Sequence, residues 1–86
     1  MRRKEIAETV FRIVSDVSSV SRREFTQESF LREDLGLDSL DIEGIVLCCE
    51  QEFMTRMKPA PRREIRRVSD VVDLVCDSIE KEDCHD

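Results

Sequence analysis

The residues best suited to chemistry lie together in one short segment, Asp34-Leu35-Gly36-Leu37-Asp38-Ser39-Leu40-Asp41. Its glycine permits a tight turn, and Asp38 is a favoured residue type at the position that precedes a helix. Ser39 would then be the first exposed residue of that helix, near the free backbone N–H groups of its first turn. Because a helix N-terminus stabilises negative charge, the segment predicts a hydroxyl that can carry an attached anion.

Three apolar patterns predict the helices that must position this serine. Residues 3–18 carry apolar side chains three and four positions apart, which predicts a helix with one buried face. Asp38 caps a second helix that has Asp41 at its third position and runs to about Met54. A third helix is predicted from about residue 68, and its end frays into residues 80–83. The apolar positions are Ile6, Val10, Phe11, Ile13, Val14 and Val17 in the first helix and Val68, Val71, Val72, Val75 and Ile79 in the third.

The second predicted helix has apolar residues over a wide angle, so we expect it to be the central helix of the fold. Residues 18–34 lack a period and predict a long loop, anchored by Phe25, Phe30 and Leu31. Pro59 and Pro61 break the chain after the second helix. The segment from Ala60 to Ile65 has room for only a turn or so of helix.

This order of elements predicts an all-α fold, a small antiparallel four-helix bundle of three longer helices and one short helix. A long loop separates its first and second helices. We expect a single domain over residues 1–86, with frayed ends at 1–2 and 81–86. A chain of 86 residues has no room for a separate substrate domain. A carrier, an adaptor or a DNA-binding module is therefore favoured over an enzyme.

The net charge of −6 disfavours nucleic acid as a general partner and favours basic protein surfaces. The charges are segregated, because residues 31–55 hold one basic and seven acidic residues, whereas residues 56–68 hold six basic and one acidic. Residues 69–86 are again acidic, with a net charge of −6. The arginine pairs 62–63 and 66–67 could suggest a DNA-binding regulator, but no basic recognition helix accompanies them.

The cysteines favour a reducing compartment. Cys48 and Cys49 are adjacent in a helical run, where their side chains diverge by about 100° and cannot easily bridge. We expect these two and Cys76 to be reduced and to pack as small apolar side chains. The tail Asp83-Cys84-His85-Asp86 lacks a second ligand pair, so we predict no metal site. With no signal peptide and no membrane-spanning run, the predicted protein is cytoplasmic and monomeric, with no membrane partner.

The run from Leu31 to Asp41, with its Asp38-Ser39-Leu40 triplet, strongly resembles acyl carrier proteins. The resemblance covers nearly the whole chain. It continues through Ile42 to the end of the second helix, Glu50-Gln51-Glu52-Phe53, and to Ile65-Arg66-Arg67-Val68 before the last helix. On the triplet alone, Ser39 would be an ordinary exposed hydroxyl at a capped helix start, and the wider context reverses that interpretation.

The resemblance implies a non-catalytic carrier. Ser39 would receive a 4′-phosphopantetheine group from coenzyme A through a phosphopantetheinyl transferase, and the distal thiol would hold an acyl or related intermediate as a thioester. Acyl-loading and acyl-transferring or condensing enzymes of fatty-acid, lipid or specialised polyketide and peptide biosynthesis would be the partners. The alternatives are an unmodified helical adaptor that retains the carrier fold and, less favoured, a small DNA-binding regulator.

The resemblance also implies roles for other side chains. Acidic residues of the second helix would dock basic partner surfaces, although any one of them could equally be part of a solvated face. An acyl chain would fold into an apolar cavity whose lining could equally be ordinary core. The predicted docking residues are Asp38, Asp41, Glu50, Arg62 and Arg63, and the predicted acyl-pocket residues are Val46, Cys49, Met57, Ile65 and Val68.

Several residues depart from the family pattern. Glu43 stands where the family usually has an apolar residue, and Gly44 where it often has an acidic one. Gln51 replaces a common glutamate. Four arginines crowd a third segment that is usually acidic or rich in small residues, namely Arg62, Arg63, Arg66 and Arg67. These arginines could serve recognition, or equally solubility and pairing with the acidic last helix. We expect a specialised carrier with its own partners.

Overall fold

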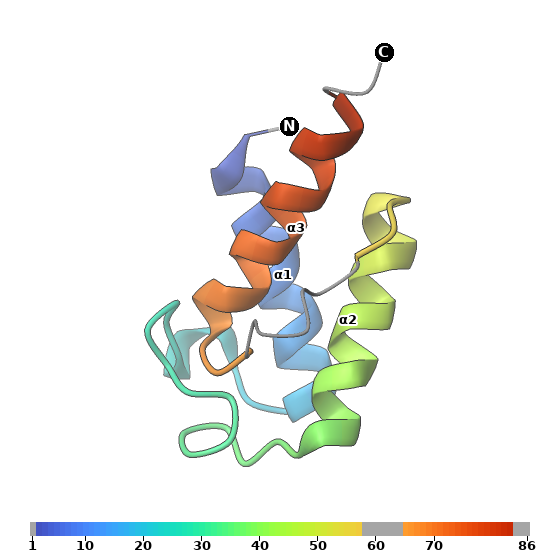
Figure 1. The fold of residues 1–86 in the computed structure, drawn as a ribbon. Coiled ribbons are helices and arrows are strands. Elements are labelled where there is room, and N and C mark those ends of the chain that lie inside the picture. Colours follow the sequence, from blue (N-terminus) through green and yellow to red (C-terminus); the bar gives the residue numbers. More distant parts are fainter. Residues whose placement is uncertain (1, 58–64, 84–86) are drawn as a thin grey trace.

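Three α-helices form the fold that the computed structural model describes for residues 2–57 and 65–83. They are α1 (Arg3–Ser18), α2 (Ser39–Phe53) and α3 (Val68–Asp83), and a turn of 3-10 helix, η1 (Arg22–Glu24), lies between α1 and α2. Figure 1 shows that α1 runs antiparallel to both α2 and α3. No strand occurs within the described ranges, so the all-α prediction is confirmed.

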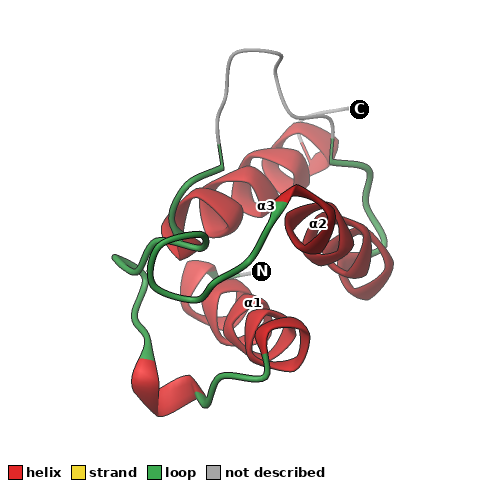
Figure 2. Ribbon diagram, turned by 90° about the horizontal axis from the view of Figure 1, so that it is seen from below, coloured by secondary structure: helices red, strands yellow, loops and turns green. Residues whose placement is uncertain are grey.

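The first helix, α1, supplies the surface on which the other two helices pack. Its five buried side chains recur at the spacing of one helical face, which is why this segment folds as an amphipathic helix. Within the described residues, α2 and α3 each contact α1 more extensively than they contact each other. Figure 2 shows the three helices in a triangular arrangement, viewed from below. The buried side chains of α1 are Ile6, Ala7, Val10, Ile13 and Val14.

Our prediction that the second helix is central is wrong. Within α2 only Ile45 and Cys49 are buried. Leu40 is 76% exposed and Leu47 is 57% exposed. The apolar side chains of α2 spread around more of the helix than the contact with α1 can cover, and the helix therefore keeps part of its apolar surface in solvent.

The loop between α1 and α2 is anchored to the core as predicted. Phe25 is 5% exposed and Leu31 is fully buried. The Phe25 ring also meets the ring of Phe11 from α1 edge-on, with 5.5 Å between their centroids. The long loop is therefore packed against the helices rather than solvated along its whole length.

The same loop is joined to the start of α3 by its backbone. The N–H of Leu31 donates to the carbonyl oxygen of Arg66 over 2.8 Å, and Phe30 and Arg67 form an isolated antiparallel β-bridge. The Arg67 guanidinium lies 4.7 Å from the centroid of the Phe30 ring and pairs with Glu28 at 3.0 Å. Arg67 therefore ties the loop to α3, and its ion pair is made with the loop rather than with the acidic last helix.

The short fourth helix predicted for residues 60–65 lies outside the described residues except for Ile65, which is not helical. That helix therefore stays a prediction. Within the described ranges, no helix is long and apolar enough to span a bilayer.

Candidate functional site

The turn that leads into α2 is held by two buried leucines. Leu35 and Leu37 are buried, and the N–H of Leu37 donates to the carbonyl oxygen of Leu31 over 2.9 Å. Between the leucines, Gly36 has a φ of +69°, a left-handed conformation that other residues disfavour. Its N–H donates to the carbonyl oxygen of Arg32 over 3.0 Å. The expected tight turn at this glycine is confirmed.

A reciprocal capping box begins α2. The Asp38 Oδ1 accepts a hydrogen bond of 2.9 Å from the backbone N–H of Asp41, and the Asp41 Oδ2 accepts one of 3.2 Å from the N–H of Asp38. The bond from the Asp41 N–H is the main reason that the pKa of Asp38 lies below its ordinary value, and the charge of Arg32 contributes. Ser39 follows as the first, exposed residue of α2, so the predicted cap and helix start are confirmed.

A guanidinium stands next to the candidate serine. The Arg32 Nη2 donates a hydrogen bond of 2.7 Å to the hydroxyl oxygen of Ser39. Sequence reasoning missed this contact, because the two residues are separated by a turn and share no helical period. The available signal was charge: Arg32 is the one basic residue among seven acidic ones in residues 31–55.

An exposed face of α2 continues from the serine. Leu40, Gly44 and Leu47 lie four and seven positions apart and so share one face of the helix. Both leucines are exposed, and a Cβ added to Gly44 would meet no atom within 4 Å. This face of α2 therefore presents two exposed apolar side chains close to Ser39. The site thus combines an exposed hydroxyl, a nearby cation and an open apolar surface.

Comparison with known proteins decides the family. No protein-family model matches the chain. An acyl carrier protein of Saccharopolyspora erythraea is 34% identical to it over 79 residues, which cover 92% of this chain and 83% of the relative. An acyl carrier protein of Coprothermobacter proteolyticus is 37% identical over 75 residues, which cover 87% of this chain and 92% of the relative. One of Thermotoga maritima is 36% identical over 73 residues, which cover 85% of this chain and 90% of the relative. The chain belongs to the acyl carrier protein family.

The predicted docking residues of this family member fall into three settings. Asp38 is exposed and Asp41 half-buried beside Ser39, with each carboxylate already accepting its capping hydrogen bond. Glu50 is half-buried, and its Oε2 accepts a 2.9 Å hydrogen bond from the backbone N–H of Met57, which stabilises the turn after α2. Arg62 and Arg63 lie outside the described residues. Their shared role in docking stays a prediction.

The predicted acyl-pocket residues lie in or against the hydrophobic core of this acyl carrier protein family member. Cys49, Met57 and Val68 are buried, whereas Val46 and Ile65 are half-buried and pack against the core. Core packing therefore accounts for all five side chains in the described structure. Their use by a cargo chain stays a prediction.

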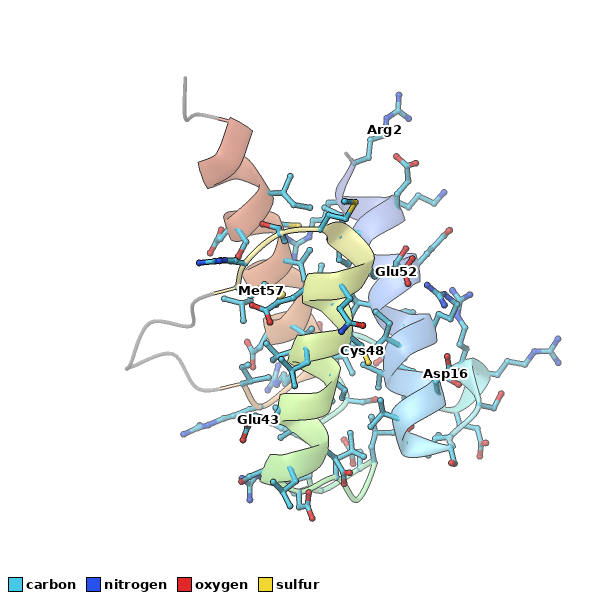
Figure 3. The ribbon with its side chains drawn as sticks, turned by 90° about the vertical axis from the view of Figure 1, so that its right-hand side faces the viewer. Arg2, Asp16, Glu43, Cys48, Glu52 and Met57 are labelled. Carbon is cyan, nitrogen blue, oxygen red and sulfur yellow. The ribbon has the colours of Figure 1, made fainter. Side chains whose placement is uncertain are left out.

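A groove of about 380 Å³ runs between α1 and α2. Figure 3 shows Asp16 of α1 and Cys48 and Glu52 of α2 along this boundary. The Arg12 Nη2 pairs with the Glu52 Oε1 at 2.9 Å and so bridges the two helices. Cys48 is exposed, which corrects our expectation that it packs as a small apolar side chain, because it lines this open groove between α1 and α2 instead of the buried core.

The other described cysteines agree better with expectation. Cys49 is buried and Cys76 is half-buried, and the three described cysteines are in the thiol form. Burial is the main cause that raises the pKa of the Cys49 thiol to about 12. Among the described residues, no group of three or more His, Cys, Asp or Glu side chains could hold a metal ion. Cys84 and His85 lie outside them.

Proposed function

We propose that Ser39 carries a 4′-phosphopantetheine arm, transferred from coenzyme A by a phosphopantetheinyl transferase. The observation that carries this proposal is the exposed Ser39 hydroxyl at the capped start of α2, in a chain that belongs to the acyl carrier protein family. The surroundings fit a phosphodiester, because the positive end of the α2 dipole and the Arg32 guanidinium both favour negative charge there. The group would supply a thiol on a flexible tether.

The chain acts as a carrier and not as an enzyme. The tethered thiol holds an acyl or related intermediate as a thioester, and the tether raises its effective concentration at a docked partner enzyme. The names of the matching relatives support an acyl-carrying role in biosynthesis. The bond chemistry belongs to the partner enzymes.

Partner enzymes approach the surface around the start of α2. The exposed Leu40 and Leu47 offer apolar contact, while Asp38 and Asp41 contribute negative potential that attracts basic surfaces. Glu50, Arg62 and Arg63 complete the proposed docking set. The departure at Gly44, which leaves this face open, supports a specialised set of partners.

The cargo chain lodges among Val46, Cys49, Met57, Ile65 and Val68, next to the core. Their apolar character and their place between α2 and the start of α3 support this part of the proposal. Entry of a chain requires these side chains to move apart, since three of the five are buried in the described structure.

The decisive experiment is intact-mass analysis after incubation with coenzyme A and a broad-specificity phosphopantetheinyl transferase. The chain should gain the mass of one phosphopantetheine, and Ser39→Ala should abolish the gain. Ser69→Ala is the matched control, because Ser69 also lies in the first turn of a helix, α3, and should leave the gain intact. A folded wild-type chain that gains no mass would refute the proposal and favour the unmodified adaptor.

A further inference from the structure

We propose that Arg32 is the positioning residue for the modified serine: it orients the Ser39 hydroxyl before modification and pairs with the phosphodiester afterwards. This inference rests on the proposed function of Ser39. It assigns a role to a residue that lies outside α2 and that sequence reasoning did not select.

Hydrogen bonds and burial hold the backbone around Arg32, so its side chain starts from a fixed position close to Ser39. The preceding residue, Leu31, is fully buried, and its N–H donates to the carbonyl oxygen of Arg66 over 2.8 Å. The carbonyl oxygen of Arg32 itself accepts the N–H of Gly36 over 3.0 Å. The residue before the arginine and the arginine's own carbonyl group are therefore held, and its guanidinium reaches Ser39 from an anchored loop.

The charges around Arg32 support a specific role for this side chain. Residues 31–55 contain seven acidic residues and Arg32 as their one basic residue. That cation is placed 2.7 Å from the Ser39 oxygen, and it helps to lower the pKa of the adjacent Asp38. A cation that served only solubility would have no reason to lie against the single candidate serine of this acidic segment.

The hydrogen bond has a direct consequence for the transfer step. Arg32 donates to the hydroxyl oxygen, so it leaves the hydroxyl proton free to point toward a base of the transferase. The Ser39 oxygen then forms a bond to the phosphorus that carries the pantetheine, the bond from that phosphorus to 3′,5′-ADP breaks, and the serine proton passes to the transferase base. The guanidinium offsets the negative charge of the incoming diphosphate throughout.

After transfer, the same guanidinium faces the new phosphodiester. The planar arginine fork matches phosphate oxygens in a bidentate arrangement, which a lysine ammonium cannot reproduce. Arg32 is exposed, so the effect should be moderate and should weaken as salt screens the charges. We expect the arm to be restrained at its base while its distal thiol stays free.

The test compares Arg32→Gln with Arg23→Gln. Arg23 is an exposed arginine of η1, so both variants change the net charge equally, and far-UV circular dichroism checks that both fold. The first readout is the ³¹P resonance of the modified protein without any transferase present. It should shift and narrow in Arg32→Gln, remain as in wild type in Arg23→Gln, and be only partly restored in Arg32→Lys.

The second readout is the rate of modification at several salt concentrations. Arg32→Gln should lower kcat/KM about two- to fivefold at low salt, with the difference shrinking as salt increases, whereas Arg23→Gln should change it less. If wild type is modified but its ³¹P resonance is the same in all the variants, the role of Arg32 is refuted and the proposed function stands. If wild type gains no phosphopantetheine, both fall together.

Discussion

The contributions of the two faces of α2 to stability can be compared by removing the same amount of side chain from each face. Ile45→Ala and Leu47→Ala both remove about three methylene equivalents, which are worth about 0.8 kcal/mol each when fully buried. Ile45 is fully buried, so its truncation should cost about 2.4 kcal/mol in transfer free energy and about 3 to 4 kcal/mol once a cavity is included. Leu47 is 57% exposed, so its truncation should cost about 1 kcal/mol or less.

Urea unfolding followed by circular dichroism at the helical band measures both costs. The free energy of unfolding of a domain this size is about 4 to 13 kcal/mol, so Ile45→Ala removes a large share of it. The milder Ile45→Val, at about 0.5 to 1.5 kcal/mol, gives a measurable value if the alanine variant does not fold. Equal losses at the two positions, or a larger loss at Leu47, would refute the arrangement in which α2 packs by one face only.

Three further predictions concern the turn, the cap and the thiols. Gly36→Ala should destabilise the fold by about 1 to 2 kcal/mol because of the left-handed φ of this residue. Gly44→Ala should stabilise it by about 0.5 to 1 kcal/mol, because a Cβ at this helical position meets no other atom. Urea midpoints measure both changes, and a shift of both midpoints in the same direction would contradict the geometry. The pKa of Asp38 lies below its ordinary value of 3.8, so its ionised carboxylate contributes fully to stability well above pH 3.8, and this contribution is lost as the pH falls from that value through the lower pKa of the folded chain. Asp38→Asn should therefore show a weaker acid dependence of the urea midpoint, and an unchanged profile would count against the cap. At about pH 8 iodoacetamide should label Cys48 well before Cys49, whose burial raises its thiol pKa to about 12; peptide mapping would contradict this by finding equal labelling.

The helices and the cap could be predicted because their causes are local. Apolar residues spaced three and four positions apart define α1, and the side chains of Asp38 and Asp41 accept their capping hydrogen bonds within one helical turn. The tight turn at Gly36 is also local, since its hydrogen bond joins residues four positions apart. Each of these features depends on residues only a few positions apart.

The burial of α2 could not be predicted in the same way. Leu40 and Leu47 are as apolar as Ile45, and which of the three is buried depends on how much of α2 the neighbouring helix covers. The contact between Arg32 and Ser39 depends on the path of the turn between them, and the stacking of Arg67 on Phe30 joins residues far apart in sequence. Composition shows that such residues exist, but only the folded chain brings them together.

The helix that carries Ser39 is fastened to the rest of the domain by few buried side chains. α2 buries two residues, whereas α1 buries five. Segments with few buried apolar contacts open locally at a lower free energy than the whole domain unfolds. We therefore expect α2 to separate transiently as a unit while α1 and α3 stay paired, with its amide hydrogens exchanging first. Such local opening would let a cargo chain enter beneath α2, and a partner bound to α2 could control its release.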